Sequence, residues 1–287
     1  MLGKSQLEKI ISLLVELGIL PQQGPASWQV RLSTCHSFIF YQNHLDFVQV
    51  KLGMNISLLN EYISLQKAYS IFPEYVPSPY GLFQCGADQL MVTQGVAHQP
   101  MARGRHDLSR QEQYQLFEFF TRYNHYFQLS VSVSSMLSLF EETTPYIKSI
   151  LAEILRYPGI AQHGDLALTN VGHTPSGLVI FDWEDFGGVT FPFYDMTVFL
   201  CSFYDFKVDV IFEVLNSKNR MQSFIKEVLK EAGISLLTYK RWIPVHLALF
   251  SIMKSKLGYS REIAELSLNA SDTAIRQLNN WEKACVI

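Results

Sequence analysis

The most informative residues of the chain run His163-Gly-Asp-Leu-Ala-Leu-Thr-Asn170 and, beyond a turn, Leu178-Val-Ile-Phe-Asp182-Trp-Glu184. Asp165 and Asn170 share a short loop that leads into a strand, and the turn through Gly177 brings the chain back to Asp182. Carboxylate and amide oxygens are ligands that Mg²⁺ prefers, and a carboxylate can also orient a hydroxyl and accept its proton. The spacing therefore predicts a phosphoryl-transfer site in which three oxygen-bearing side chains converge.

This segment resembles the catalytic loop and metal-binding motif of the aminoglycoside phosphotransferase and choline kinase family, small-molecule relatives of protein kinases. The family pattern is His-x-Asp-x-x-x-x-Asn, followed by a strand that ends in Asp, often as Asp-x-Glu. The resemblance implies that Asp165 is the catalytic base and that Asn170 and Asp182 bind magnesium. It also implies that His163 supports the loop and that Glu184 makes an extra contact to metal or substrate.

Two further aspartates follow this motif. Asp185-Phe-Gly187 spells the metal-binding tripeptide of protein kinases, but Asp185 lies beyond the apolar strand, whereas Asp182 stands at its end. We therefore favour Asp182 as the metal ligand and expect the Phe-Gly pair to form a turn. Asp195 resembles the family aspartate that binds the backbone of the catalytic loop from a helix start; as a plain helix cap it would occupy the same place.

Residues that bind the nucleotide are expected upstream. Lys51 ends the strand-like run Phe47-Val-Gln-Val-Lys51 and resembles the kinase lysine that contacts the α- and β-phosphates. Glu61 lies in the following helical segment, where the family places the ion-pair partner of that lysine. Gln94-Gly-Val-Ala97 resembles the hinge between the two lobes, so Gln94 and Val96 are expected to bind adenine through backbone groups.

The hydrophobic pattern predicts an α+β chain. An amphipathic helix occupies the first twenty residues and ends at Pro21. Five antiparallel strands are expected at 28–32, 37–42, 46–52, 82–85 and 89–93, and helices at 55–69, 110–129, 144–157 and beyond 196. With the resemblance, this order implies a bilobal protein-kinase-like fold. The small nucleotide-binding sheet lobe spans 1–96, and the larger helical lobe, with the catalytic loop and acceptor site, spans 97–287.

The composition limits the classes of binding partner and the compartment that we expect for this chain. The 287 residues include 23 Lys and Arg against 26 Asp and Glu, without a basic cluster, so nucleic acid is not an expected ligand. No apolar run approaches the roughly 20 residues that span a bilayer. The four cysteines are widely spaced and form no CxxC pair, which suits a reducing cytoplasm. We expect a soluble cytoplasmic protein, and its oligomeric state stays open.

The motifs together predict an ATP- and Mg²⁺-dependent phosphotransferase acting on a hydroxyl of a small molecule, with GTP not excluded as donor. A sugar, glycoconjugate, amino alcohol or aminoglycoside is the expected acceptor, and Tyr204, Asp205, Asp209 and Trp242 are candidate contacts for it. A protein kinase is an alternative, but the Ser33–Ser37 loop lacks glycine and no Ala-Pro-Glu follows Asp182. The other alternative is a non-catalytic nucleotide-binding module, which the complete motif set disfavours.

Overall fold

A computed structural model describes residues 4–32, 36–41, 47–53, 57–101, 108–126, 140, 144–256 and 261–285. The chain forms two compact units, which we call the sheet unit, 1–99 with 172–184, and the helical unit, 100–171 with 185–287. The segment 172–184 thus groups with the sheet, although the division expected from the sequence assigned it to the second lobe. Residues 33–35 of the loop without glycine lie outside the described residues.

The sheet unit contains the five antiparallel strands that the sequence predicts, in the order β1-β2-β3-β5-β4. Their bounds are β1 Ser27–Leu32, β2 His36–Tyr41, β3 Phe47–Gly53, β4 Pro79–Cys85 and β5 Asp88–Gln94. Strand β3 is central: Lys51 pairs with Met91 of β5, and Val50 pairs with Val92. This confirms a small antiparallel sheet and sets the position of Lys51 within it.

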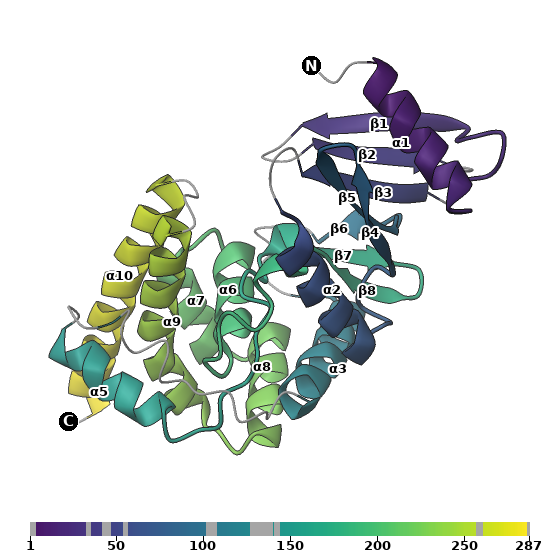
Figure 1. Cartoon of the computed structure of the whole chain (residues 1–287). Coiled ribbons are helices and arrows are strands. Elements are labelled where there is room, and N and C mark those ends of the chain that lie inside the picture. The colour runs from purple at the N-terminus through teal and green to yellow at the C-terminus, as the bar shows by residue number, and fades with distance from the viewer. Residues whose placement is uncertain are drawn as a thin grey trace. The chain divides into compact units, whose positions relative to one another are not determined.

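Helix α1 (Lys4–Glu16) lies across one face of this sheet (Figure 1). Its buried residues Ile10 and Leu14 pack in one apolar cluster with Val48 and Val50 of β3. Because side chains alternate along a strand, Lys51 points to the opposite face. Helix α2 (Leu59–Ile71) buries Leu65 and packs beside β4. Burial of the β3 valines against α1 therefore fixes the direction of the Lys51 side chain.

A second, three-stranded sheet has the order β6-β7-β8, with β6 Gln99–Pro100, β7 Val171–Thr174 and β8 Gly177–Ile180. The Thr174 hydroxyl oxygen accepts the N–H groups of Ser176 and Gly177, which closes the expected turn. The strand boundaries differ from those predicted. Strand β8 ends at Ile180, two residues before Asp182. Asn170 closes the 3₁₀ turn Leu168–Asn170, directly before β7 begins.

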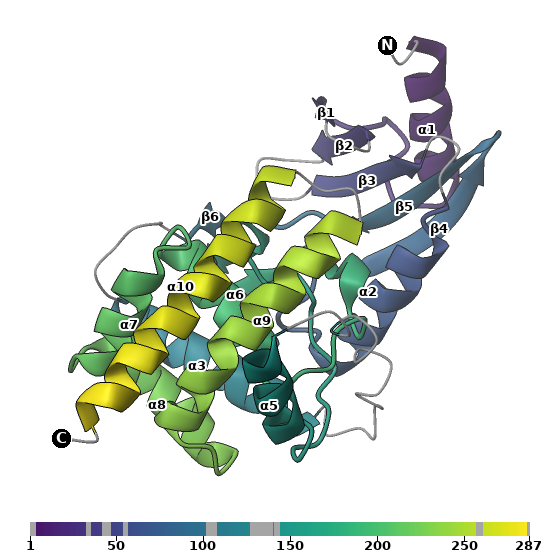
Figure 2. The same ribbon diagram turned by 90° about the vertical axis from the view of Figure 1, so that its left-hand side faces the viewer.

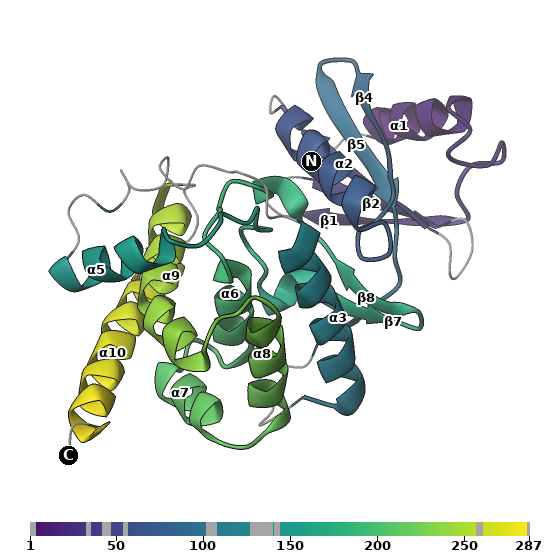
Figure 3. The ribbon, with the colours of Figure 1, turned by 90° about the horizontal axis from the view of Figure 1, so that it is seen from below.

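The helical unit consists mainly of helices, as the sequence predicts. Their bounds are α3 Arg110–Tyr126, α5 Pro145–Ile154, α6 Tyr194–Phe203, α7 Val208–Asn216, α8 Arg220–Glu231, α9 Leu236–Lys256 and α10 Arg261–Cys285. Helix α6 is buried on nearly all sides, while α9 and α10 lie side by side (Figure 2). Helices α3 and α8 also pack together (Figure 3).

Aromatic side chains form the core between these helices. Phe120 of α3 lies 6.3 Å from Phe199 of α6 and 5.7 Å from Phe224 of α8, measured between ring centroids. All three rings are nearly or fully buried. The buried α6 therefore serves as the packing centre of the helical unit.

Within the described residues, no helix has the length and apolar character needed to cross a membrane.

Candidate active site

Lys51 and Glu61 form a close ion pair in the sheet unit. The Lys51 Nζ atom lies 2.7 Å from both carboxylate oxygens of Glu61, and 3.4 Å from Oε2 of Glu184. Strand β3 supplies the lysine, and the first turn of α2 supplies Glu61. The structure thus brings Lys51 together with the partner that the sequence predicts, and it adds Glu184.

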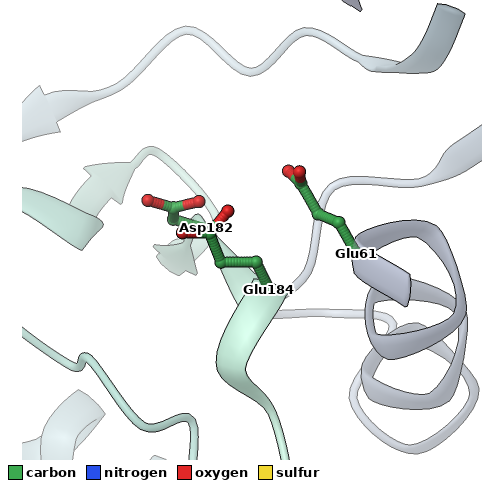
Figure 4. A group of neighbouring side chains, drawn as sticks. All are labelled: Glu61, Asp182 and Glu184. Atoms are coloured by element: carbon green, nitrogen blue, oxygen red, sulfur yellow. The ribbon is translucent and has the colours of Figure 1, made fainter. Parts of the chain in front are cut away.

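Asp182 completes a group of three carboxylates around this lysine. Carboxylate oxygens of Glu61, Asp182 and Glu184 lie within 4.8 Å of one another. Figure 4 shows that Glu61 extends from α2, whereas Asp182 and Glu184 come from the stretch that follows β8. Asp182 is exposed and has a φ of +62°, in the left-handed region that aspartate tolerates better than most residues.

The charges in this group are unequal. Burial by itself lowers the pKa of Lys51, but the Glu61, Glu184 and Asp182 carboxylates outweigh it and raise the pKa above the ordinary lysine value. Burial raises the pKa of Glu61, and the two neighbouring carboxylates raise it further, against the lowering effect of Lys51. One ammonium therefore faces more negative charge than it neutralises. Hard oxygen donors with surplus negative charge fit a divalent cation such as Mg²⁺.

The expected hinge follows β5. The Gln94 N–H donates to the Ser78 carbonyl at 2.8 Å, and the Val96 carbonyl is 3.0 Å from Nδ1 of His98. Between them, the Gly95 N–H donates to the Phe47 carbonyl. A Cβ atom on Gly95 would lie 1.9 Å from the Phe47 ring, so the close approach requires glycine here. These bonds already occupy two backbone groups of the predicted adenine-binding residues.

Asp195 holds the loop that carries Asp165, in the helical unit. Its carboxylate accepts the N–H groups of His163 at 2.5 Å and Gly164 at 3.0 Å, together with the Tyr123 hydroxyl at 2.5 Å. Asp195 is completely buried, and burial raises its pKa although these donors oppose the shift. The geometry agrees with the loop-binding position implied by the resemblance, and Tyr123 is a partner that the sequence did not indicate.

The loop itself is fixed by its own polar groups. The buried His163 accepts the Asp165 N–H at its Nδ1 atom, at 3.3 Å. The Asn170 side-chain amide donates to the Asp165 carbonyl at 2.8 Å. Because the amide nitrogen is used in this bond, the Asn170 Oδ1 atom is the group that can act as a metal ligand.

Asp165 has a partner that sequence analysis missed. Nζ of Lys254, near the end of α9, lies 2.8 Å from Oδ2 of Asp165. Lys254 also lies 5.3 Å from the centre of the Phe250 ring, one helical turn earlier. Its side chain is 7% exposed, which is unusual for lysine. The available signal was a lysine directly after the mainly apolar run Leu247–Met253, on the same helix face as Phe250.

Asp185 lies in different surroundings from Asp182, at the start of a turn and against the loop that carries Asp165. The turn expected at Phe186-Gly187 is present, and the Gly188 N–H donates to the Asp185 carbonyl at 2.9 Å. Gly164 has a φ of +92°, and a Cβ atom there would lie 2.7 Å from Cβ of Asp185. Asp185 therefore packs directly against the glycine of the Asp165 loop, which only a residue without a side chain permits.

The residues considered for the acceptor lie in varied surroundings. Trp242 is fully buried and packs edge-on against Tyr157 at 4.9 Å, and Tyr204 is 4% exposed. Both therefore belong to the core of the helical unit. Asp205 is exposed at a left-handed φ of +50°, and exposed Asp209 accepts a hydrogen bond from Gln277.

The two units match known structures over nearly their whole length. A microcompartment-associated aminopropanol kinase has a TM-score of 0.59 at 12% identity, covering 96% of this chain and 98% of that one. A choline/ethanolamine kinase family protein from Mesorhizobium loti has a TM-score of 0.55 at 16% identity, covering 93% and 95%. The chain has the protein-kinase-like fold. An ADP-bound aminoglycoside phosphotransferase shares it, with a TM-score of 0.53 at 15% identity and coverage of 95% and 97%.

By sequence, no family model matches the chain, and no curated protein is significantly similar to it. Identities of 12–16% show a shared fold and leave the substrate open. The α+β architecture and the kinase-like fold implied by the resemblance are thus confirmed.

Proposed function

We propose that the protein is an ATP- and Mg²⁺-dependent phosphotransferase that phosphorylates a hydroxyl of a small molecule. The observation that carries the proposal is the Lys51–Glu61 ion pair beside the Asp182 and Glu184 carboxylates. A lysine held in this way can bind phosphate oxygens, and the neighbouring carboxylates can bind the metal that accompanies them. Solved structures with this fold include complexes with ADP and AMP-PNP, which favours an adenine nucleotide over GTP.

Each unit would contribute a separate part of the chemistry. In the sheet unit, Lys51 would contact the phosphates, and backbone groups near Gln94 and Val96 would contact adenine. Asp182 would bind Mg²⁺, with Glu184 as a further contact. In the helical unit, Asn170 would offer its Oδ1 atom as a metal ligand. The bound ion would offset negative charge on the phosphates.

In the helical unit, Asp165 would orient the acceptor hydroxyl and accept its proton. Phosphoryl transfer depends mainly on positioning, so a base on a firmly held loop is the feature to expect. His163 and Asp195 supply that support through the hydrogen bonds described above. From these contacts, the simplest assignment gives His163 and Asp195 a structural role and gives Asp165 a chemical role.

The acceptor we propose is a sugar, glycoconjugate, amino alcohol or aminoglycoside. Proteins with this fold include kinases named for aminopropanol, ethanolamine and fructosamine, and one complex contains hygromycin B. All of these names refer to small hydroxyl- or amine-bearing compounds. Two free thiols, Cys85 and Cys201, support action in the reducing cytoplasm.

The test uses γ-labelled ATP, Mg²⁺ and pooled sugars, amino alcohols and aminoglycosides. We expect label in a small molecule, and a loss of at least about 100-fold in the Asp165→Ala variant with nearly unchanged ATP affinity. The matched control is Asp272→Ala, which removes an exposed aspartate from α10. Label on polypeptide would instead indicate a protein kinase. ATP binding without transfer to any acceptor would favour the non-catalytic module.

A further inference from the structure

Among the lysines of the helical unit whose burial the structure describes, Lys254 stands out because it is buried. Its side chain is 7% exposed, its Nζ atom lies 2.8 Å from Oδ2 of Asp165, and the Phe250 ring lies beneath it. A lysine side chain has four rotatable carbons and usually keeps its ammonium in water. Here that flexible chain is confined between an aromatic ring and a carboxylate, so the ammonium has a fixed position.

The Asp165 residue is restrained at separate points. Its N–H is bound by His163, and its carbonyl is bound by the Asn170 side chain. Both of these bonds hold the backbone and leave the side-chain torsions free. The ion pair with Lys254 acts on the carboxylate itself. Three different residues therefore restrain three different parts of Asp165.

We infer that Lys254 is a positioning residue for Asp165, an inference that rests on the proposed phosphotransferase function. By binding Oδ2, Lys254 fixes the rotation of the carboxylate and leaves Oδ1 to face the acceptor hydroxyl. During transfer, the hydroxyl oxygen forms a bond to the γ-phosphorus while the bond from phosphorus to the bridging oxygen of ADP breaks. The hydroxyl proton passes to Oδ1 of Asp165. A charged group at the position of Lys254 is required for this orientation.

The burial of Lys254 explains why this ion pair can restrain the geometry of Asp165. Exposed ion pairs contribute little because water screens them and their side chains stay mobile. At 7% exposure the Lys254 ammonium has few waters to replace Asp165, so rotation of the carboxylate away from it leaves a buried charge without compensation. The ion pair therefore favours one orientation of the carboxylate strongly.

The test compares Lys254→Met and Lys254→Arg with Lys240→Met, a control at a lysine on the same helix that binds Asn216. We expect Lys254→Met to lower kcat by roughly 10- to 100-fold, with the KM for ATP changed by less than about twofold. Lys254→Arg keeps the charge and should recover part of kcat. Lys240→Met should match the wild type.

A double-mutant cycle separates positioning from a general effect on folding. If Lys254 acts through Asp165, the double variant Asp165→Asn with Lys254→Met should be no slower than Asp165→Asn alone. A purely structural role predicts multiplied losses instead. The double variant also carries neither charge, so it should fold even if Lys254→Met is too unstable to assay. The midpoint of thermal unfolding of each variant is measured alongside the kinetics.

Each outcome has a distinct meaning. An active wild type with an equally active Lys254→Met variant overturns the role of Lys254 and leaves the phosphotransferase function intact. Additive losses in the cycle do the same. A wild type that binds ATP and transfers no phosphoryl group overturns the proposed function and the role of Lys254 with it. A loss of kcat that disappears in the Asp165→Asn background supports the inference.

Discussion

The sheet unit and the helical unit each place a lysine against carboxylates, but in different ways. Lys51 is 20% exposed and lies among three carboxylates, whereas Lys254 is 7% exposed and is ion-paired with Asp165. Around Lys51, negative charge remains after the ammonium is counted, and a divalent ion can use it. The deeper burial of Lys254 suits the fixing of geometry. We therefore propose that similar residue types bind ligand in one unit and orient a carboxylate in the other.

The largest expected effect comes from removing the lysine of the sheet unit. Lys51→Met should lower kcat/KM for ATP by roughly 100- to 1000-fold, because it removes a phosphate contact and leaves three carboxylates to repel the phosphates. Steady-state kinetics measure this, with Lys67→Met as the control at an exposed lysine of α2. A variant that keeps more than half of the wild-type value would show that Lys51 does not bind the nucleotide.

In the helical unit, the loop that carries Asp165 depends on Asp195 for its shape. Asp195→Ala should lower the free energy of unfolding by about 3 kcal/mol, since it leaves the Tyr123 hydroxyl and the His163 and Gly164 N–H groups without an acceptor in the core. Urea unfolding measures the change, with Asp272→Ala as the exposed control. A loss below about 1 kcal/mol would mean that the loop carrying Asp165 holds its shape without this aspartate.

The smallest expected effect separates the two lysine sites by their response to metal. Mg²⁺ at about ten times its Kd should raise the thermal unfolding midpoint by roughly 2–4 °C relative to EDTA. Changing Asp182 to Asn and Glu184 to Gln together should abolish this rise, because the oxygen donors lose their charge. Asp165→Asn should keep it. Differential scanning fluorimetry is the measurement, and equal shifts in all three proteins would contradict a metal site in the sheet unit.

The sheet and the position of Lys51 could be predicted because they follow from local patterns. Val48 and Val50 alternate with Lys51, so one face of the strand is apolar and the lysine must lie on the other. Glu61 follows in the first turn of the next helix. Periodicity thus predicts the face on which Lys51 lies, whereas its pairing with Glu61 was expected from the resemblance to the kinase family.

Other parts of the site depend on contacts that periodicity does not encode. Lys254 is far from Asp165 in the sequence and meets it only because α9 packs in the helical unit. Phe181 continues the apolar pattern of the strand, although β8 ends at Ile180 and the backbone turns at Asp182. Trp242 was a candidate for the acceptor, but it is buried; an aromatic residue on a helix has the same appearance in the sequence in either role.

The left-handed backbone at Asp182 has a consequence for protein engineering. Its φ of +62° lies in a region that aspartate and asparagine enter at lower cost than β-branched residues do. An exchange to asparagine therefore removes the charge without adding backbone strain, whereas valine or isoleucine would remove the charge and strain the turn at the same time. Of these exchanges, only asparagine separates the effect of the carboxylate from the effect of the turn.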